Sequence, residues 1–177
     1  LHHARLALGK PEWILFEDGE YAFQRTLSYA YDVERFVQAL AEARTHKRGD
    51  AYWDVVQRAV DCYSGDFLSE CESEWASVER ATRREQFFEA AVKLGAGYFD
   101  AARYTEACAV YEKIIAFENW NEDAHRALMR CFAKMGDVPR ARRQYETLRQ
   151  VLHDELNAEP SHETRLLYEK LKRGNSV

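Results

Sequence analysis

The chain has 177 residues, which is enough to bury the core of one domain of ordinary size. Hydrophobic residues make up 46% and charged residues 31%, a balance that excludes a disordered protein. The net charge of −5 argues against general affinity for nucleic acid, because that affinity needs clustered Lys and Arg. With only 8 Gly and 3 Pro, a fold of many strands and tight turns is also excluded, and we expect a mostly helical protein.

The sequence carries no targeting signal. No stretch approaches the roughly 18 consecutive apolar residues of a membrane span, and the N-terminus lacks the order of a signal peptide. We therefore expect a cytoplasmic protein with no membrane partner. The four cysteines show no C-x-x-C spacing, so we expect free, buried thiols at Cys62, Cys71, Cys108 and Cys131.

Residues 1–24 predict the end of a helix followed by a β-hairpin. Apolar residues about one turn apart indicate a helix up to Gly9, which is a suitable left-handed C-cap. Because the chain begins inside this helix, we expect a fragment. Asp18-Gly19 then separates two aromatic, β-favouring runs. A helix end followed by a hairpin is how a winged-helix DNA-binding domain finishes, although the acidic tip of this hairpin would be repelled by phosphates.

Two helices of moderate length are expected next. Asp32 can cap the first, whose apolar stripe consists of Val33, Phe36, Val37, Leu40 and Ala43. Gly49 ends that element and Asp50 can cap the second, whose stripe consists of Trp53, Val56, Ala59, Val60 and Tyr63. We interpret this pair as a degenerate leading repeat.

A long helix should follow a break at residues 64–66. We expect Phe67 and Leu68 to fill the core after the break. The apolar stripe of the long helix consists of Trp75, Val78, Thr82, Phe88, Ala91, Leu94 and Tyr98. Gly95 is the small residue that would let paired helices approach closely.

One apolar pattern then occurs twice between residues 94 and 148. Each equivalent pair is 34 residues apart, as in Leu94 and Leu128, Tyr98 and Phe132, Ala107 and Ala141, Tyr111 and Tyr145, and Ile114 and Leu148. This is the period of the tetratricopeptide repeat, in which each helical hairpin buries its apolar face against its neighbours. Asn121, Pro139 and Asn157 are expected at helix ends, and Pro160-Ser161 starts a last helix that covers the open end of the array.

No pattern for catalysis or for a cofactor is present. The sequence has no Gly-rich phosphate loop, no zinc-binding histidine motif and no nucleophile elbow. The carboxylates are spread over helical faces as solvated charges usually are. We therefore expect no enzyme, no cofactor and no metal site.

One predicted surface is basic. Arg126, Arg130 and Lys134 are separated by four residues each, so they form a row along one helix face. Residues 125–152 hold seven Lys and Arg, among them Arg142 and Arg143, against two Asp and Glu. One interpretation is a merely solvated face. The other is a docking surface for an acidic helix or tail, with these five cations as the partner-binding residues.

Several runs together resemble one known family. They are residues 63–68 (YSGDFL) with Glu74-Trp75, residues 121–130 (NEDAHRALMR), residues 141–146 (ARRQYE) and residues 154–161 (DELNAEPS). Over about residues 31–172 the chain resembles the bacterial transcriptional activator domain. The resemblance implies an all-α fold for residues 31–177, a tetratricopeptide-like right-handed superhelix of antiparallel helix pairs. It implies that residues 1–30 are the hairpin-bearing end of a winged helix.

In SARP-type activators this domain follows an OmpR-type winged helix, so the resemblance implies a transcriptional regulator of the activator type. Residues 1–9 resemble the end of the recognition helix, which would place His2, His3 and Arg5 nearest the major groove of promoter DNA. The repeat domain would contact RNA polymerase, a regulatory protein or, as a homodimer, a second copy. Two alternatives are a general repeat scaffold that binds a peptide or protein, and the interaction module of a larger signalling ATPase.

Overall fold

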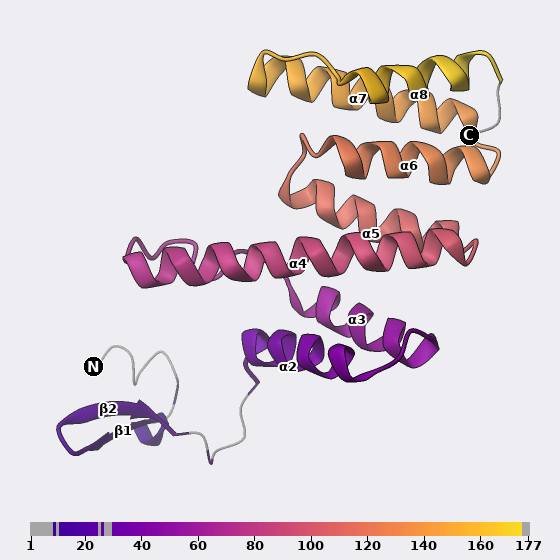
Figure 1. Ribbon diagram of the computed structural model, residues 1–177. Helices are drawn as coiled ribbons and strands as arrows, with labels where there is room; N and C mark the ends of the chain where they lie inside the picture. The colour runs from indigo at the N-terminus through magenta and orange to yellow at the C-terminus, as the bar shows by residue number, and fades with distance from the viewer. Residues whose placement is uncertain (1–8, 10, 25, 27–29, 175–177) are drawn as a thin grey trace. The chain divides into compact units, whose positions relative to one another are not determined.

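The computed structural model describes residues 9, 11–24, 26 and 30–174 of the chain (Figure 1). The chain divides into two compact units, Leu1–Asp32 and Val33–Val177.

The first unit contains a two-stranded antiparallel sheet. A short 3-10 helix, η1 (Pro11–Trp13), leads into β1 (Ile14–Glu17), which pairs with β2 (Glu20–Phe23). Between the strands, Asp18 has φ 53° and Gly19 has φ 84°, as a tight turn that follows strand twist requires. The predicted hairpin is therefore confirmed. The helix expected over residues 1–8 lies outside the described residues.

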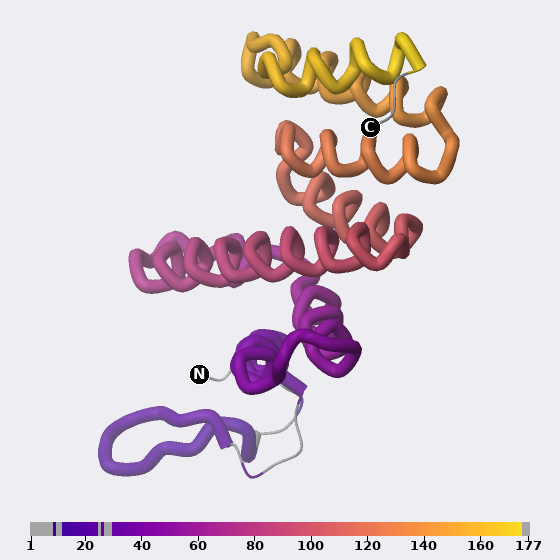
Figure 2. Tube along the Cα trace, turned by 45° about the vertical axis from the view of Figure 1, so that its right-hand side comes forward, coloured from indigo at the N-terminus to yellow at the C-terminus, as the bar shows by residue number. Residues whose placement is uncertain are grey.

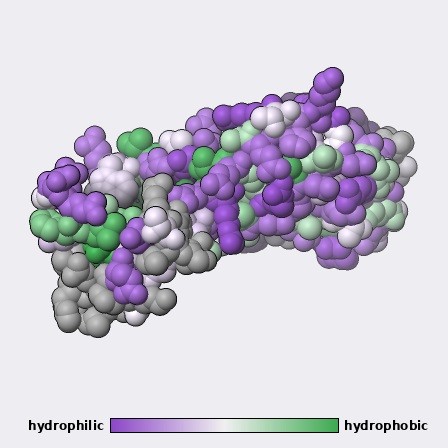
Figure 3. All heavy atoms as spheres, turned by 90° about the horizontal axis from the view of Figure 1, so that it is seen from below, coloured by the Kyte–Doolittle hydropathy of each residue, from purple (hydrophilic) through white to green (hydrophobic). Residues whose placement is uncertain are grey.

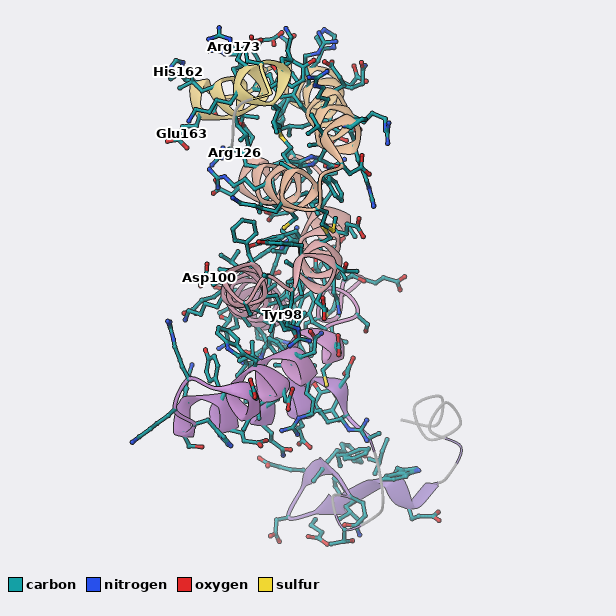
Figure 4. All side chains as sticks on the ribbon, turned by 90° about the vertical axis from the view of Figure 1, so that its right-hand side faces the viewer. Tyr98, Asp100, Arg126, His162, Glu163 and Arg173 are labelled. Atoms are coloured by element: carbon teal, nitrogen blue, oxygen red, sulfur yellow. The ribbon has the colours of Figure 1, made fainter. Side chains whose placement is uncertain are left out.

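The second unit is a stack of helices. They are α2 (Asp32–Thr45), whose first residue belongs to the first unit, α3 (Asp50–Cys62), α4 (Glu74–Asp100), α5 (Tyr104–Phe117), α6 (Glu122–Lys134), α7 (Val138–Leu156) and α8 (His162–Lys172). Successive helices from α4 to α8 run in opposite directions (Figures 1 and 2). They form two layers, with α4, α6 and α8 in one and α5 and α7 in the other (Figure 4). The expected all-α, tetratricopeptide-like fold is confirmed.

The core follows the 34-residue pattern. Leu94 and its equivalent Leu128 are buried, as are all the other residues of the repeated pairs. Gly95 allows the close contact between α4 and α5, since a Cβ there would lie 2.6 Å from Cζ of Tyr111. Gly97 does the same for α3, because a Cβ there would lie 2.5 Å from the Trp53 ring.

The start of α4 differs from the prediction. Trp75 and Val78 are 61% and 63% exposed, and Phe87 rather than Phe88 is fully buried. Leu68, expected in the core, is 47% exposed with φ 43°. The loop before α4 is held instead by Arg80, whose guanidinium donates hydrogen bonds to the carbonyls of Phe67, Leu68 and Cys71. A helical stripe shows which side chains share a face, but not whether another element covers that face.

The structure also differs from the predictions in α2, in α3 and at the cysteines. Val37 lies at the exposed side of α2, while Ala39 is buried. Asp50 is the first residue of α3 and makes no side-chain cap, because Gly49 occupies the cap position in an extended conformation. The four cysteines are free, but only two are buried, namely Cys108 and Cys131.

The predicted helix ends in the repeat region are confirmed. The side chain of Asn121 accepts a hydrogen bond from the backbone N–H of Ala124 at 3.0 Å. Pro139 lies in the first turn of α7, and Asn157 ends that helix in the left-handed conformation, with φ 48° and ψ 42°. Ser161 caps α8. Figure 3 shows a surface that is mainly hydrophilic, with apolar side chains scattered over it.

Candidate partner-binding surface

Arg126 lies at the junction of α6 and α8. Its Nη1 donates to Oγ1 of Thr164 at 3.0 Å, and its guanidinium pairs with Asp123 and lies 3.6 Å from Oε2 of Glu163. Figure 4 shows Arg126, Glu163 and His162 on the same side of the stack, at α6 and α8. The side chain of Arg126 is only 13% exposed.

The expectation that Arg126 belongs to an exposed row is therefore wrong. Helical spacing places it on the same face as Arg130 and Lys134, but α8 folds back over the first turn of α6 and covers it. Its charge is balanced by carboxylates within the unit.

Glu122 completes this junction. Its carboxylate accepts hydrogen bonds from the backbone N–H of Ser161 at 3.0 Å and from the hydroxyl of Thr164 at 2.6 Å. Thr164 is fully buried. Burial acts to raise the pKa of Glu122, but the hydrogen bonds from Thr164 and Ser161 outweigh it and lower the pKa. The charged form of Glu122 thus fastens the start of α8 to α6.

Arg142 also has a structural role. Its Nη2 donates to the carbonyls of Leu171 at 3.0 Å and Lys172 at 3.1 Å. These carbonyls lie at the C-terminal end of α8, where carbonyls lack helical partners and a cation is favourable. Arg126 and Arg142 therefore hold the two ends of α8.

The other three predicted cations are exposed. Arg130 and Lys134 lie on α6 and Arg143 lies on α7, and none makes an ion pair or a side-chain hydrogen bond within the described part of the chain. At the equivalent positions of the first repeat, 34 residues earlier, Arg130 corresponds to Ala96 and Lys134 to Asp100. The unpaired positive charge is thus a property of the second repeat.

Tyr111 is a core residue of the repeat that also carries a polar hydroxyl. It is 7% exposed, and its hydroxyl makes no hydrogen bond with any described residue. Burial raises the pKa of Tyr111 to about 12; Cys131, Asp100 and Cys108 also raise it, and Arg130 lowers it. No sequence signal distinguishes this tyrosine from its equivalent, Tyr145.

The remaining predicted sites are placed as follows. His2, His3 and Arg5 lie outside the described residues, so their contact with DNA stays a prediction. Within residues 9, 11–24, 26 and 30–174, no group of three or more His, Cys, Asp or Glu side chains is arranged to hold a metal ion. Among the helices that the structure describes, none has the length and apolar character to cross a membrane.

Comparison with known families identifies the helical unit. The model of the bacterial transcriptional activator domain matches residues 31–172, which is more than half of the chain. No curated protein matches the chain. The matched residues include every helix of the stack, from α2 to α8, and the match agrees with the all-α fold. The chain therefore belongs to the family of bacterial transcriptional activator domains.

Proposed function

We propose that the chain is part of a transcriptional regulator in which the helical unit mediates protein–protein interaction. The observation that carries the proposal is the family match over residues 31–172. The hairpin of β1 and β2 supports a winged-helix end in residues 1–30, which would bring the helical unit to promoter DNA. Such a regulator works by binding rather than catalysis, in the cytoplasm with the DNA and RNA polymerase of a bacterium.

The partner surface of the helical unit is proposed around Arg130, Lys134 and Arg143. Their charges have no partner within the described residues, whereas Arg126 and Arg142 are used inside the fold. Unpaired cations on a chain of net charge −5 favour an acidic partner, because complementary charge steers and orients association. The partner would be an acidic segment of RNA polymerase, of a regulatory protein or of a second copy.

A charge reversal tests this surface. Arg130→Glu with Lys134→Glu should abolish activation of a reporter gene and co-purification with RNA polymerase, because an acidic segment would then be repelled. The free energy of unfolding should change by less than about 1 kcal/mol, since both side chains are exposed and unpaired. Arg58→Glu with Arg149→Glu is the control, because it reverses two exposed cations of α3 and α7 that pair with Glu42 and Glu146 within the fold. An equal loss of reporter activation in the two double variants would contradict the proposed surface.

The DNA-binding part is tested separately. The chain extended upstream to a complete winged helix should shift promoter DNA in a gel assay, with affinity that falls as salt rises. The 177-residue chain alone should not shift this DNA. Sequence-specific binding by the 177-residue chain would refute this division of roles.

A further inference from the structure

The first turns of α4 carry apolar side chains that are largely exposed. Trp75 is 61% exposed and Val78 is 63% exposed. Thr82 is also exposed, and its hydroxyl donates to the carbonyl of Val78 at 3.0 Å, which leaves its methyl group for contacts. The spacing of three and then four residues joins these side chains along one helix face. We call Trp75, Val78 and Thr82 the outer stripe.

The outer stripe is exposed because α4 is longer than its neighbours. Figures 1 and 2 show the N-terminal half of α4 extending past the ends of α3 and α5. The loop before α4 is fastened by Arg80, which binds the carbonyls of Phe67 and Leu68. The ring of Phe67 lies edge-on to the indole of Trp75, with ring centroids 6.2 Å apart. This contact orders the indole without burying it, and an ordered aromatic side chain loses little entropy when a partner binds.

The three arginines in this part of α4 are used inside the fold. Arg80 donates to the carbonyls of the loop before the helix. Arg83 pairs with Glu79, one turn earlier. Arg84 pairs with Asp66 at 2.8 Å. Their positive charges are therefore already balanced or bonded at the start of α4.

The unpaired charges beside the outer stripe are negative. Glu74 and Glu85 are three helical turns apart on α4, so both lie along one flank of the stripe. Glu70 and Glu72 lie in the loop before the helix. All four are exposed, and within the part of the chain that the structure describes none makes an ion pair or a side-chain hydrogen bond. An apolar face is thus bordered by free carboxylates.

We propose that the start of α4 docks a basic amphipathic helix of a partner protein. Apolar residues of that helix pack on the outer stripe, and its flanking Lys or Arg residues pair with Glu74 and Glu85. A straight stripe at helical spacing suits a helix as the partner, and complementary charge fixes its orientation. The inference goes beyond the basic surface of Arg130, Lys134 and Arg143, because it adds a second surface of opposite charge.

A second copy of the chain fits this surface less well. Two copies of α4 paired in opposite directions through the outer stripe would bring Glu74 of one copy beside Glu85 of the other, because equivalent flanks face each other in such a pair. Carboxylates at that position repel each other. The unpaired charges therefore favour a different chain that is basic.

The test uses the 177-residue chain and a fluorescently labelled peptide of about 18 residues, designed as a helix with a leucine stripe flanked by Lys. Fluorescence anisotropy should show binding that weakens as salt rises. Trp75→Ala should weaken binding about tenfold or more, because the indole is the largest apolar group of the stripe. Trp120→Ala is the matched control, since it removes a 41% exposed indole between α5 and α6, and it should bind as the wild type does.

A charge reversal supplies a second variant at exposed positions. Glu74→Lys with Glu85→Lys should abolish binding of the Lys peptide and should allow binding of the same peptide with Glu in place of Lys. Asp54→Lys with Glu159→Lys is the matched control, because it changes the net charge equally at two exposed carboxylates that make no ion pair with any described residue. The control should retain its preference for the Lys peptide. Melting temperatures of both double variants should stay near that of the wild type.

Three results would overturn this docking surface. One is wild-type affinity for the Lys peptide in a folded Trp75→Ala variant. Another is equal binding of the Lys and Glu peptides by the wild type, which would show apolar adhesion alone. The third is a wild-type dimer in sedimentation that Trp75→Ala separates, which would make a second copy the occupant. Arg130→Glu with Lys134→Glu should still bind the Lys peptide, so the failure of either surface leaves the other standing.

Discussion

His125 is a buried histidine whose two ring nitrogens are both engaged. Its Nε2 lies 2.9 Å from the carbonyl of Asn119 and therefore donates, and its Nδ1 accepts from the side chain of Gln144 at 2.7 Å. This arrangement needs the neutral ring. Burial lowers the pKa of His125, and the hydrogen bonds only partly oppose that effect. His125 thus links the turn before α6 to α7, and this link requires the neutral form of its ring.

We expect the helical unit to lose stability as pH falls below about 6.5, the pKa of an unfolded histidine. In that range the unfolded chain binds a proton that the folded chain resists, so the free energy of unfolding declines until the lowered pKa of folded His125 is reached. Melting temperatures measured between about pH 7.5 and about pH 5.5 should show this slope. His125→Gln, which cannot titrate, should flatten it, and an equal slope in both proteins would rule His125 out as the cause.

At the scale of elements, α8 is held to the array by polar contacts as well as by its apolar face. Leu167 and Leu171 are buried in the core. Glu122 and Arg126 of α6 bind the first turn of α8, and Arg142 of α7 binds its last carbonyls. Because α8 has only 11 residues, it gains little stability from its own backbone and depends on these contacts.

Replacing Arg126 by Gln should therefore lower the free energy of unfolding much more than replacing Arg130 by Gln. Arg126→Gln leaves Glu122 without a nearby cation and removes the hydrogen bond to Thr164, so it should cost about 1 to 3 kcal/mol. Arg130→Gln should cost less than about 0.5 kcal/mol, because the side chain is exposed and unpaired. Urea unfolding of the two variants measures the difference. Equal midpoints would show that the α6 and α8 junction does not stabilise the unit.

At the scale of the molecule, the helical unit is a linear stack. Each helix from α4 onward packs against its neighbours in sequence, with α6 also touching α8. The aromatic cluster of Tyr63, Phe87 and Phe117 joins the end of α3 to α4 and α5. Stability in such an array is approximately the sum of contributions from each repeat and each interface between neighbours.

Leu128→Ala is expected to destabilise the unit by about 2 to 5 kcal/mol, since it leaves a cavity at a residue that is 1% exposed. The loss of stability should be uneven along the stack. Hydrogen exchange should accelerate most in α5, α6 and α7, and least in α2, which lies farthest along the array. Leu166→Ala, at an exposed position of α8, is the control and should change neither stability nor exchange. Uniform acceleration in every helix would contradict a neighbour-by-neighbour stack.

The sequence by itself determined the helical array. A 34-residue repetition of buried positions is a local property of the chain, and it predicted Leu94, Leu128, Tyr111 and Tyr145 in the core. Caps such as Asn121 and Asn157 are equally local, because each bonds to backbone only a few residues away. The hairpin turn at Asp18-Gly19 was predictable for the same reason.

Only the tertiary structure decided which charges are available to a partner. Helical spacing grouped Arg126 with Arg130 and Lys134. The guanidinium of Arg126, however, donates a hydrogen bond to Thr164 of α8, 38 positions away, and lies beside Glu163 of the same helix. Helical spacing holds no information on such contacts. The same limit explains why Trp75 and Val78 are exposed although their stripe is apolar, and why Tyr111 keeps an unpaired hydroxyl while Tyr145 is stacked on Tyr168. Burial and pairing depend on what covers a face, and that is settled by how the helices stack.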